Sequence, residues 1–175
     1  MVEALICRMI RVDASNLTIY RNLAQAYEGE FSAITGKLAD EEGLFPLDTP
    51  IAASLPEPPA SGASLIGYLA FIGDRPIGFA AIKLAESGNE VCEFYIIPAL
   101  RKQGEGMRFA HQLLRRHPGR WQIKQIQGAE YASVFWRKVI RGLGIAYQDD
   151  QLLDAYWGPV TRQQFVLDPA DPCLG

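Results

Sequence analysis

One stretch of the chain combines glycines, basic side chains and the expected start of a helix, an arrangement that binds phosphate. An apolar run over residues 91–97 predicts a strand, and residues 101–106 then lead into a predicted helix over residues 104–117. The first turn of a helix has unpaired N–H groups and a partial positive charge, which together favour an anion. The two glycines let the backbone approach a ligand closely, and the adjacent arginine and lysine add positive charge. A pyrophosphate fits such a site.

The spacing excludes two other phosphate-binding motifs. No Gly-Lys-Ser/Thr triplet follows four residues after Gly104, so the segment is not a P-loop. Phe109 stands where the dinucleotide-binding motif needs its third glycine. A protein that binds a nucleotide through the same residues remains an alternative hypothesis, although both nucleotide-binding motifs are absent.

At these residues the chain resembles the GNAT superfamily of acetyltransferases. That family has Arg/Gln-x-x-Gly-x-Gly/Ala directly after a strand, and here Arg101-x-x-Gly104-x-Gly106 follows Ile96-x-Pro98. The order of the predicted strands and helices is also similar to that of the family, over nearly the whole chain. The resemblance implies a single N-acyltransferase domain over residues 1–175 with acetyl-CoA as co-substrate. It also implies direct attack by a primary amine of a small molecule or peptide, with no covalent enzyme intermediate.

The same resemblance implies how coenzyme A would be held. The fourth strand should splay from the fifth, near residues 121–126, and open a V-shaped cleft. Backbone groups near Tyr95, Ile96 and Ile97 would pair with the pantetheine arm and the acetyl carbonyl, where an N–H would stabilise the developing oxyanion. The remaining cofactor-binding residues would hold the pyrophosphate or wall the cofactor: Arg101, Lys102, Gln103, Gly104, Glu105, Gly106, Met107, Phe135 and Trp136.

Two carboxylates on the fourth strand are candidates for the base that accepts the amine's proton. Glu90 and Glu93 are an odd number of residues apart, so strand alternation predicts that they point to opposite faces of the sheet. A partly buried carboxylate there would have a raised pKa and could act directly or through water. Glu93 lies inside the strand and Glu90 nearer its entrance; each could instead be an ion-paired strand residue. Cys92, between them, has no histidine to activate it and is expected to pack rather than react.

The chain departs from the family pattern where the leaving thiolate would be protonated. Trp136 occupies the position at which many members carry a tyrosine, and Ala129 stands for their asparagine. Tyr131, Tyr95, Tyr147 or water could replace the missing acid. This departure motivates an alternative function, a non-catalytic acyl-CoA-binding module.

The bulk properties narrow the class of protein. The 175 residues carry a net charge of −3, which does not suit a nucleic-acid binder. The cysteines are three in number and scattered, and the two histidines have no companions at metal-ligand spacing, so neither a disulfide framework nor a metal site is expected. No signal peptide or membrane span is evident, which makes the cytoplasm the expected location. A basic patch could meet the 3′-phosphate of coenzyme A or simply face solvent: Arg108, Arg115, Arg116, Arg120 and Lys124.

The pattern along the chain predicts an α/β fold with a mixed parallel and antiparallel central sheet. The resemblance implies that this sheet is GNAT-like, flanked by helices and splayed between strands 4 and 5. Ser15 is expected to cap a first helix over residues 16–31, whose apolar stripe should pack in the core: Leu17, Tyr20, Leu23, Ala24, Tyr27 and Phe31. Residues 35–62 form a proline-rich loop, a candidate for substrate selection or a surface excursion. Turn residues 73–76 predict a hairpin between strands 65–72 and 77–84. A last helix follows near residues 132–140, and the apolar residues within 145–167 form a final strand or hairpin that could close a homodimer or cover the cleft.

Overall fold

The described residues form seven strands in one mixed sheet, with helices on both faces. The computed structural model describes residues 7–47 and 64–169. The strands lie in the order β1-β2-β3-β4-β5-β7-β6, and every pair of neighbours is antiparallel except β4 and β5, which are parallel. Their bounds are β1 Arg8–Arg11, β2 Ser64–Ile72, β3 Arg75–Leu84, β4 Asn89–Ile96, β5 Gly119–Ile126, β6 Tyr147–Asp154 and β7 Gly158–Leu167. The predicted fold class is confirmed, and the predicted final element is a hairpin.

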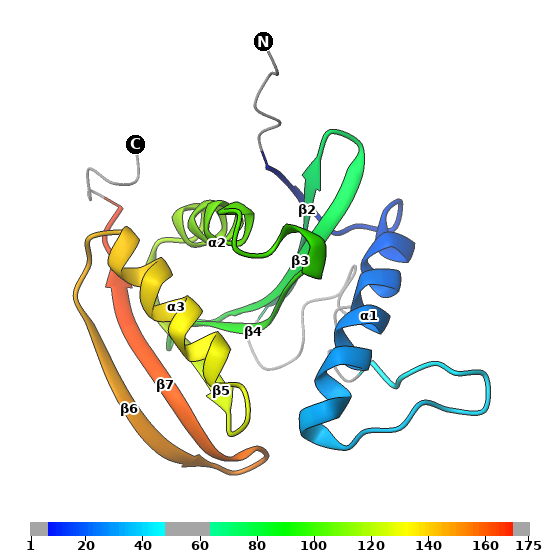
Figure 1. Cartoon of the computed structure of the whole chain (residues 1–175). Helices are drawn as coiled ribbons and strands as arrows, with labels where there is room; N and C mark the ends of the chain where they lie inside the picture. The colour runs from blue at the N-terminus through cyan, green and yellow to red at the C-terminus, as the bar shows by residue number, and fades with distance from the viewer. Residues whose placement is uncertain (1–6, 48–63, 170–175) are drawn as a thin grey trace.

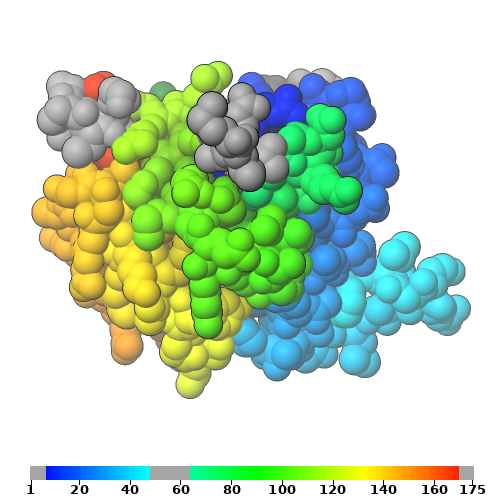
Figure 2. Space-filling view, turned by 45° about the horizontal axis from the view of Figure 1, so that its top comes forward, coloured from blue at the N-terminus to red at the C-terminus, as the bar shows by residue number. Residues whose placement is uncertain are grey.

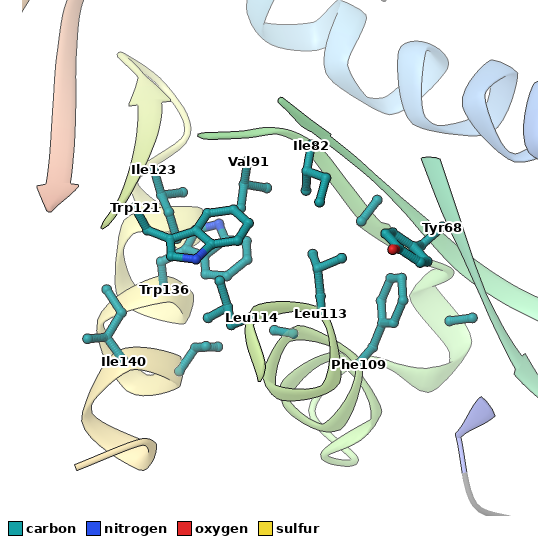
Figure 3. Close-up of a cluster of buried hydrophobic side chains, with 14 of the residues drawn as sticks. Tyr68, Ile82, Val91, Phe109, Leu113, Leu114, Trp121, Ile123, Trp136 and Ile140 are labelled. Atoms are coloured by element: carbon teal, nitrogen blue, oxygen red, sulfur yellow. The ribbon is translucent and has the colours of Figure 1, made fainter. Parts of the chain in front are cut away.

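In the part of the chain that the structure describes, three α-helices cover the sheet. They are α1 (Leu17–Thr35), α2 (Glu105–Arg116) and α3 (Glu130–Gly142), and a short 3-10 turn, η2 (Pro98–Leu100), lies between β4 and α2. Helices α2 and α3 lie on one face of the sheet and α1 lies on the other (Figures 1 and 3). None of the described helices is both long enough and apolar enough to cross a membrane.

Each face of the sheet buries its own apolar cluster. Between the sheet and helices α2 and α3, Trp121 packs with Leu113, Leu114 and other buried side chains, and its indole N–H donates to the His117 carbonyl at 2.8 Å (Figure 3). On the α1 face a smaller cluster contains Tyr20, Ala24, Leu69, Phe71, Phe79 and Tyr95. Burial on both faces explains why the central strands read as continuous apolar runs.

The start of α1 differs from the prediction. Ser15 does not cap the helix, because its N–H and its hydroxyl both donate to the Asp13 carboxylate, at 2.8 and 2.6 Å. Asn16 occupies the N-cap position instead, and its side chain binds backbone groups of Arg11 and Asp13. A neighbouring carboxylate has thus taken up the hydroxyl that the sequence assigned to the helix end.

The predicted long loop is described only up to residue 47. Residues 36–47 contain no helix or strand and project from the body of the molecule (Figures 1 and 2). Gln25 of α1 anchors this segment, since its side-chain amide donates to the Phe45 carbonyl and accepts from the Phe45 N–H, at 2.9 and 2.8 Å. The rest of the predicted loop, residues 48–62, lies outside the described residues.

Candidate active site

The strands β4 and β5 separate after a short parallel contact. They pair only at Asn89–Trp121, Glu90–Gln122 and Val91–Ile123. Beyond Val91, β4 keeps its bonds to β3, while β5 follows β7 to its end. The edge of β4 that faces β5 therefore has no strand partner among the described residues from Cys92 to Ile96. This is the splayed cleft that the sequence predicted.

The anion loop (residues 101–106) connects this free edge to α2. Lys102 has a φ of 62° and Gly104 a φ of 93°, both in the left-handed region, so the backbone turns sharply before the helix. The first helical bond here runs from the Arg108 N–H to the Gly104 carbonyl at 3.0 Å, which leaves the preceding N–H groups at the helix end. A Cβ added to Gly106 would lie 3.3 Å from the Phe135 ring and 3.5 Å from Ile96. Glycine at 106 thus allows α2 to begin directly against β4 and α3.

Arg101 does not extend freely from the anion loop. Its guanidinium donates to the Ile96 carbonyl at 2.8 Å, pairs with Glu30 of α1 at 2.9 Å and lies over the Tyr95 ring. The Tyr95 hydroxyl donates to the same Glu30 carboxylate at 3.0 Å. Arg101 therefore ties α1 to the end of β4.

The predicted basic patch is divided between the two faces of the sheet. Lys124 lies on the side of β5 opposite the buried Trp121 and Ile123, and it forms ion pairs with Glu90 and Asp154. The arginines of α2 belong to the other face. Lys124 is therefore part of the cleft, and it is separate from the basic side chains on α2 with which the sequence analysis grouped it.

A cavity of about 790 Å³ opens beside the splay; we call it the cleft cavity. Its walls come from both strands of the splay, from α1, from α3 and from the β6–β7 turn. The two strands contribute Glu90, Cys92 and Glu93 of β4 and Lys124 and Gln125 of β5. The α1 side contributes Tyr27, Glu28, Phe31 and Thr35, followed by Lys37. The remaining wall includes Tyr131 and Trp136 of α3 and Tyr156 and Trp157 of the turn.

A bulge in β4 brings both candidate carboxylates to this cavity. Ala81 of β3 pairs with Glu93 while Ile82 pairs with Val91, so Cys92 is an extra residue in β4. The prediction that Glu90 and Glu93 face opposite sides is wrong, because the inserted residue restores them to one face. Both carboxylates line the cleft cavity.

The two carboxylates have different partners. Glu93 accepts a hydrogen bond from the Tyr20 hydroxyl at 3.1 Å. Burial, followed by the nearby charge of Glu93, raises the pKa of Tyr20, so this hydroxyl stays protonated and keeps donating. Both oxygens of Glu90 are bound, one by the Gln122 amide at 2.9 Å and the other by Lys124 at 3.2 Å. An incoming ammonium group would have to displace Lys124 before it could transfer a proton to Glu90.

Cys92 is exposed to the cavity but is a poor nucleophile. Burial by the surrounding protein, together with Glu90 and Glu93, raises the pKa of its thiol to about 12. The reactive thiolate is therefore scarce at neutral pH.

Of the three tyrosines proposed to replace the missing acid, only Tyr131 lines the cleft cavity. Tyr95 is bound to Glu30, and Tyr147 lies in β6 beside Arg141. Trp136 is buried against Phe94 and Phe135, at ring-centroid distances of 5.0 and 5.2 Å, and it closes the inner wall of the cavity.

The sequence analysis did not identify a buried polar chain behind the cavity. The Ser133 hydroxyl of α3 donates to Gln125 of β5 at 2.9 Å, and the Gln125 amide donates to Gln163 of β7 at 2.9 Å. All three side chains are buried. They fix α3 relative to β5. The sequence carries no clear signal for them, because both strands contain other polar residues, such as Gln122 in β5 and Gln164 in β7.

The β6–β7 turn that carries Tyr156 and Trp157 is held by Asp154. Its carboxylate accepts from the backbone N–H groups of both aromatic residues, at 2.9 and 3.1 Å, and from Lys124 at 3.0 Å. These bonds lower the pKa of Asp154 to about 2. A lowered folded-state pKa stabilises the fold above the unfolded value near 3.8, and the contribution is lost as pH falls toward 2.

Replacing Asp154 with asparagine should therefore remove part of the protein's acid sensitivity. The free energy of unfolding of the wild type should fall by about 1 kcal/mol or less from this group between pH 4 and pH 2, because solvent screens the carboxylate. Urea unfolding at several pH values measures the difference between the two proteins. An asparagine variant with an unchanged pH slope would show that Asp154 does not hold the turn.

Comparison with known proteins identifies the fold. No family model and no curated protein sequence matches the chain, whereas solved structures do. The ribosomal-protein-S18-alanine N-acetyltransferase of Escherichia coli aligns with a TM-score of 0.59 at 8% identity, over 95% of this chain and 97% of that one. A protein assigned to the GNAT family of acetyltransferases, from Bacteroides thetaiotaomicron, aligns with a TM-score of 0.61 at 15% identity, over 94% and 90%.

A third structure contains a bound cofactor. The Bacillus subtilis acetyltransferase in complex with CoA aligns with a TM-score of 0.54 at 12% identity, over 93% of this chain and 99% of that one. At these identities the similarity establishes architecture. The chain has the fold of the GNAT acetyltransferases, with the splay between β4 and β5 as its defining feature.

Proposed function

We propose that this chain transfers an acetyl group from acetyl-CoA to a primary amine. One observation carries the proposal: the unpaired edge of β4 runs from the anion loop at one end to a carboxylate-lined cavity at the other. The similarity to acetyltransferases, one of them bound to CoA, supports the same function.

The residues of the donor side fit coenzyme A. The first-turn N–H groups of α2 and the sharp backbone at Lys102 and Gly104 suit a pyrophosphate, with Gln103 through Met107 supplying the donors. The free edge of β4, which ends near Tyr95 and Ile96, offers backbone groups of alternate residues to the amides of the pantetheine arm, as an added strand would use them. The Ile97 N–H is already bound to the Ile77 carbonyl at 2.9 Å and the Ile96 carbonyl to Arg101, so those two groups would have to give up a partner first. Bound there, acetyl-CoA supplies the thioester that is the acyl donor.

On the acceptor side, Glu93 is the better candidate for the base. It lines the cleft cavity and is oriented by Tyr20. Glu90 is engaged by Lys124 and Gln122, so we assign it a positioning role at the junction of β4 and β5. Glu93 would receive the ammonium proton directly or through water before the amine attacks. Tyr131 at the cavity is the candidate donor of a proton to the leaving thiolate.

The alternative function is an acyl-CoA-binding module without catalysis. Trp136 offers no titratable proton where it lines the cavity, and Phe135 packs close to the start of α2, with its ring 3.3 Å from a Cβ placed on Gly106. Either residue could hold an acyl-CoA without assisting transfer.

Release of free thiol from acetyl-CoA in the presence of primary amines separates the two functions. The enzyme should release thiol at a rate that depends on the amine and saturates with it. A protein that binds acetyl-CoA but shows no amine-dependent release, across a panel of small amines and amine-terminated peptides, would be the binding module.

A further inference from the structure

The mouth of the cleft cavity is ringed by exposed aromatic side chains. Tyr131 is 67% exposed, Tyr156 76% and Trp157 45%. Among the described residues these are the only exposed large aromatic side chains, and all three line this one cavity. Large aromatic surface left in water around a concave site is typical of ligand binding.

The aromatic rim consists of Tyr131 of α3 with Tyr156 and Trp157 of the β6–β7 turn, and it continues inward to Phe31 and Tyr27 of α1. Phe31 of α1 lies 6.4 Å from Trp157 in an edge-to-face arrangement and stacks on Tyr27 at 5.3 Å. Tyr156 and Trp157 are in contact at 4.7 Å, on the turn that Asp154 holds. A flat apolar group entering the cavity would contact ring faces and edges from α1 and the turn together.

The charged side chains of the cleft cavity come from β4, β5, α1 and the segment after α1, and they select a particular kind of amine. The lining contains Glu28, Glu90 and Glu93 against Lys37 and Lys124. Both lysines are held by carboxylates, Lys37 by Glu28 at 3.0 Å and Lys124 by Glu90 and Asp154. An ammonium group is favoured at this floor, whereas a substrate carboxylate would have to displace an existing ion pair.

We propose that the acceptor is an arylalkylamine, a primary amine joined by a short chain to a ring-sized apolar body, with no carboxylate beside the amine. The ring lies among Phe31, Tyr131 and Trp157, and the amine reaches the floor near Glu93. This inference rests on the proposed acetyltransferase function and names its substrate class.

A matched set of amines tests each part of the inference. In the thiol-release assay, phenethylamine should exceed ethylamine in kcat/KM by about 30-fold, because the ring is buried among apolar side chains. Phenethylamine should exceed phenylalanine by about 100-fold, because the added carboxylate meets like charge. Phenylalaninamide has the same carbon skeleton as phenylalanine but a neutral amide in place of the carboxylate. It should recover most of the lost kcat/KM. A preference for 1,4-diaminobutane over phenethylamine would overturn the assignment in favour of a polycation.

Variants locate the effect at the rim. Trp157→Ala should raise KM for phenethylamine about 10-fold while leaving ethylamine unchanged. Val166→Ala, which removes another exposed apolar side chain outside the cavity lining, is the matched control and should change neither. Equal effects on both amines would contradict a ring-binding rim.

Failure of this inference and failure of the proposed function give different results. Amine-dependent thiol release without preference for phenethylamine leaves the acetyltransferase standing and overturns the arylalkylamine assignment. If no amine supports release, saturation-transfer NMR on the CoA-saturated protein decides the matter. Binding of phenethylamine but not phenylalanine would then support the ligand class without the reaction, and binding of neither would overturn it.

Discussion

Replacing Glu93 with glutamine should lower kcat/KM for acetyl transfer by about 10²- to 10⁴-fold, which is the usual contribution of a positioned general base. Glutamine keeps the size of the side chain and can still accept the Tyr20 hydroxyl bond, but it cannot take up a proton. Affinity for acetyl-CoA, measured by calorimetry, should change little, because the anion loop lies at the other end of β4. The loss should appear in kcat.

Glu90→Gln is the matched control for that variant. The two carboxylates share a strand, a face and a cavity, but only Glu90 is bound to Lys124. We expect Glu90→Gln to reduce kcat/KM by about 10-fold or less, through a weaker ion pair at the floor. If Glu90→Gln proves the more damaging of the two, the assignment of the base is reversed.

Gly78→Val should be the most destabilising of the glycine substitutions considered. Gly78 of β3 pairs with Ile96, and a Cβ there would lie 2.2 Å from the Tyr95 carbonyl oxygen and 2.7 Å from the end of the Ile96 side chain. The clash is with backbone, so β4 itself must move. We expect a loss of about 3 kcal/mol in the free energy of unfolding. Because Tyr95 and Ile96 form the free edge of the cleft, affinity for acetyl-CoA should fall as well.

Gly29→Ala gives the comparison for urea unfolding. Gly29 is in the interior of α1, where a Cβ would meet the Phe45 ring at 3.6 Å, an ordinary contact, and no other described residue within 4 Å. Alanine there should be neutral or stabilise the protein by up to about 1 kcal/mol. Wild-type stability of Gly78→Val would mean that β3 and β4 are not in the register described here.

The features that could be predicted from the sequence are those with local causes. Gly73 to Pro76 predicts the tight turn of the β2–β3 hairpin, and the structure has that hairpin. The break at Pro98 and the glycines at 104 and 106 predict a strand, a turn and a helix start in the right order. Each depends on the conformational limits of one or two residues, which are visible without the rest of the fold.

The features that could not be predicted depend on distant parts of the chain. The bulge at Cys92 has no local marker, since its neighbours fit a regular strand, yet it decides which way Glu90 points. Tyr20 reaches Glu93 across 73 positions of sequence. Tyr27 and Phe31 have the spacing of core residues and were predicted to be core. Tyr27 does pack against the buried cluster on the α1 face, next to Phe79 and Tyr95. Both residues also line the cleft cavity, because helical spacing does not say whether the space opposite is filled.

Calorimetric titration with acetyl-CoA tests directly whether the chain binds this cofactor at residues 101–106. The wild type is compared with Gly104→Glu and Gly144→Glu. Both glycines have positive φ, and a Cβ would meet only the Arg108 guanidinium at 3.8 Å at Gly104 and nothing within 4 Å at Gly144 among the described residues. The two variants therefore carry a similar backbone strain, but only Gly104 belongs to the anion loop. We expect one acetyl-CoA to bind per chain. Gly144→Glu should retain this affinity, and Gly104→Glu should weaken it at least about 100-fold, because its carboxylate meets the pyrophosphate. A folded wild-type protein that binds no acetyl-CoA, or a Gly104→Glu variant that binds it as tightly, would contradict the account.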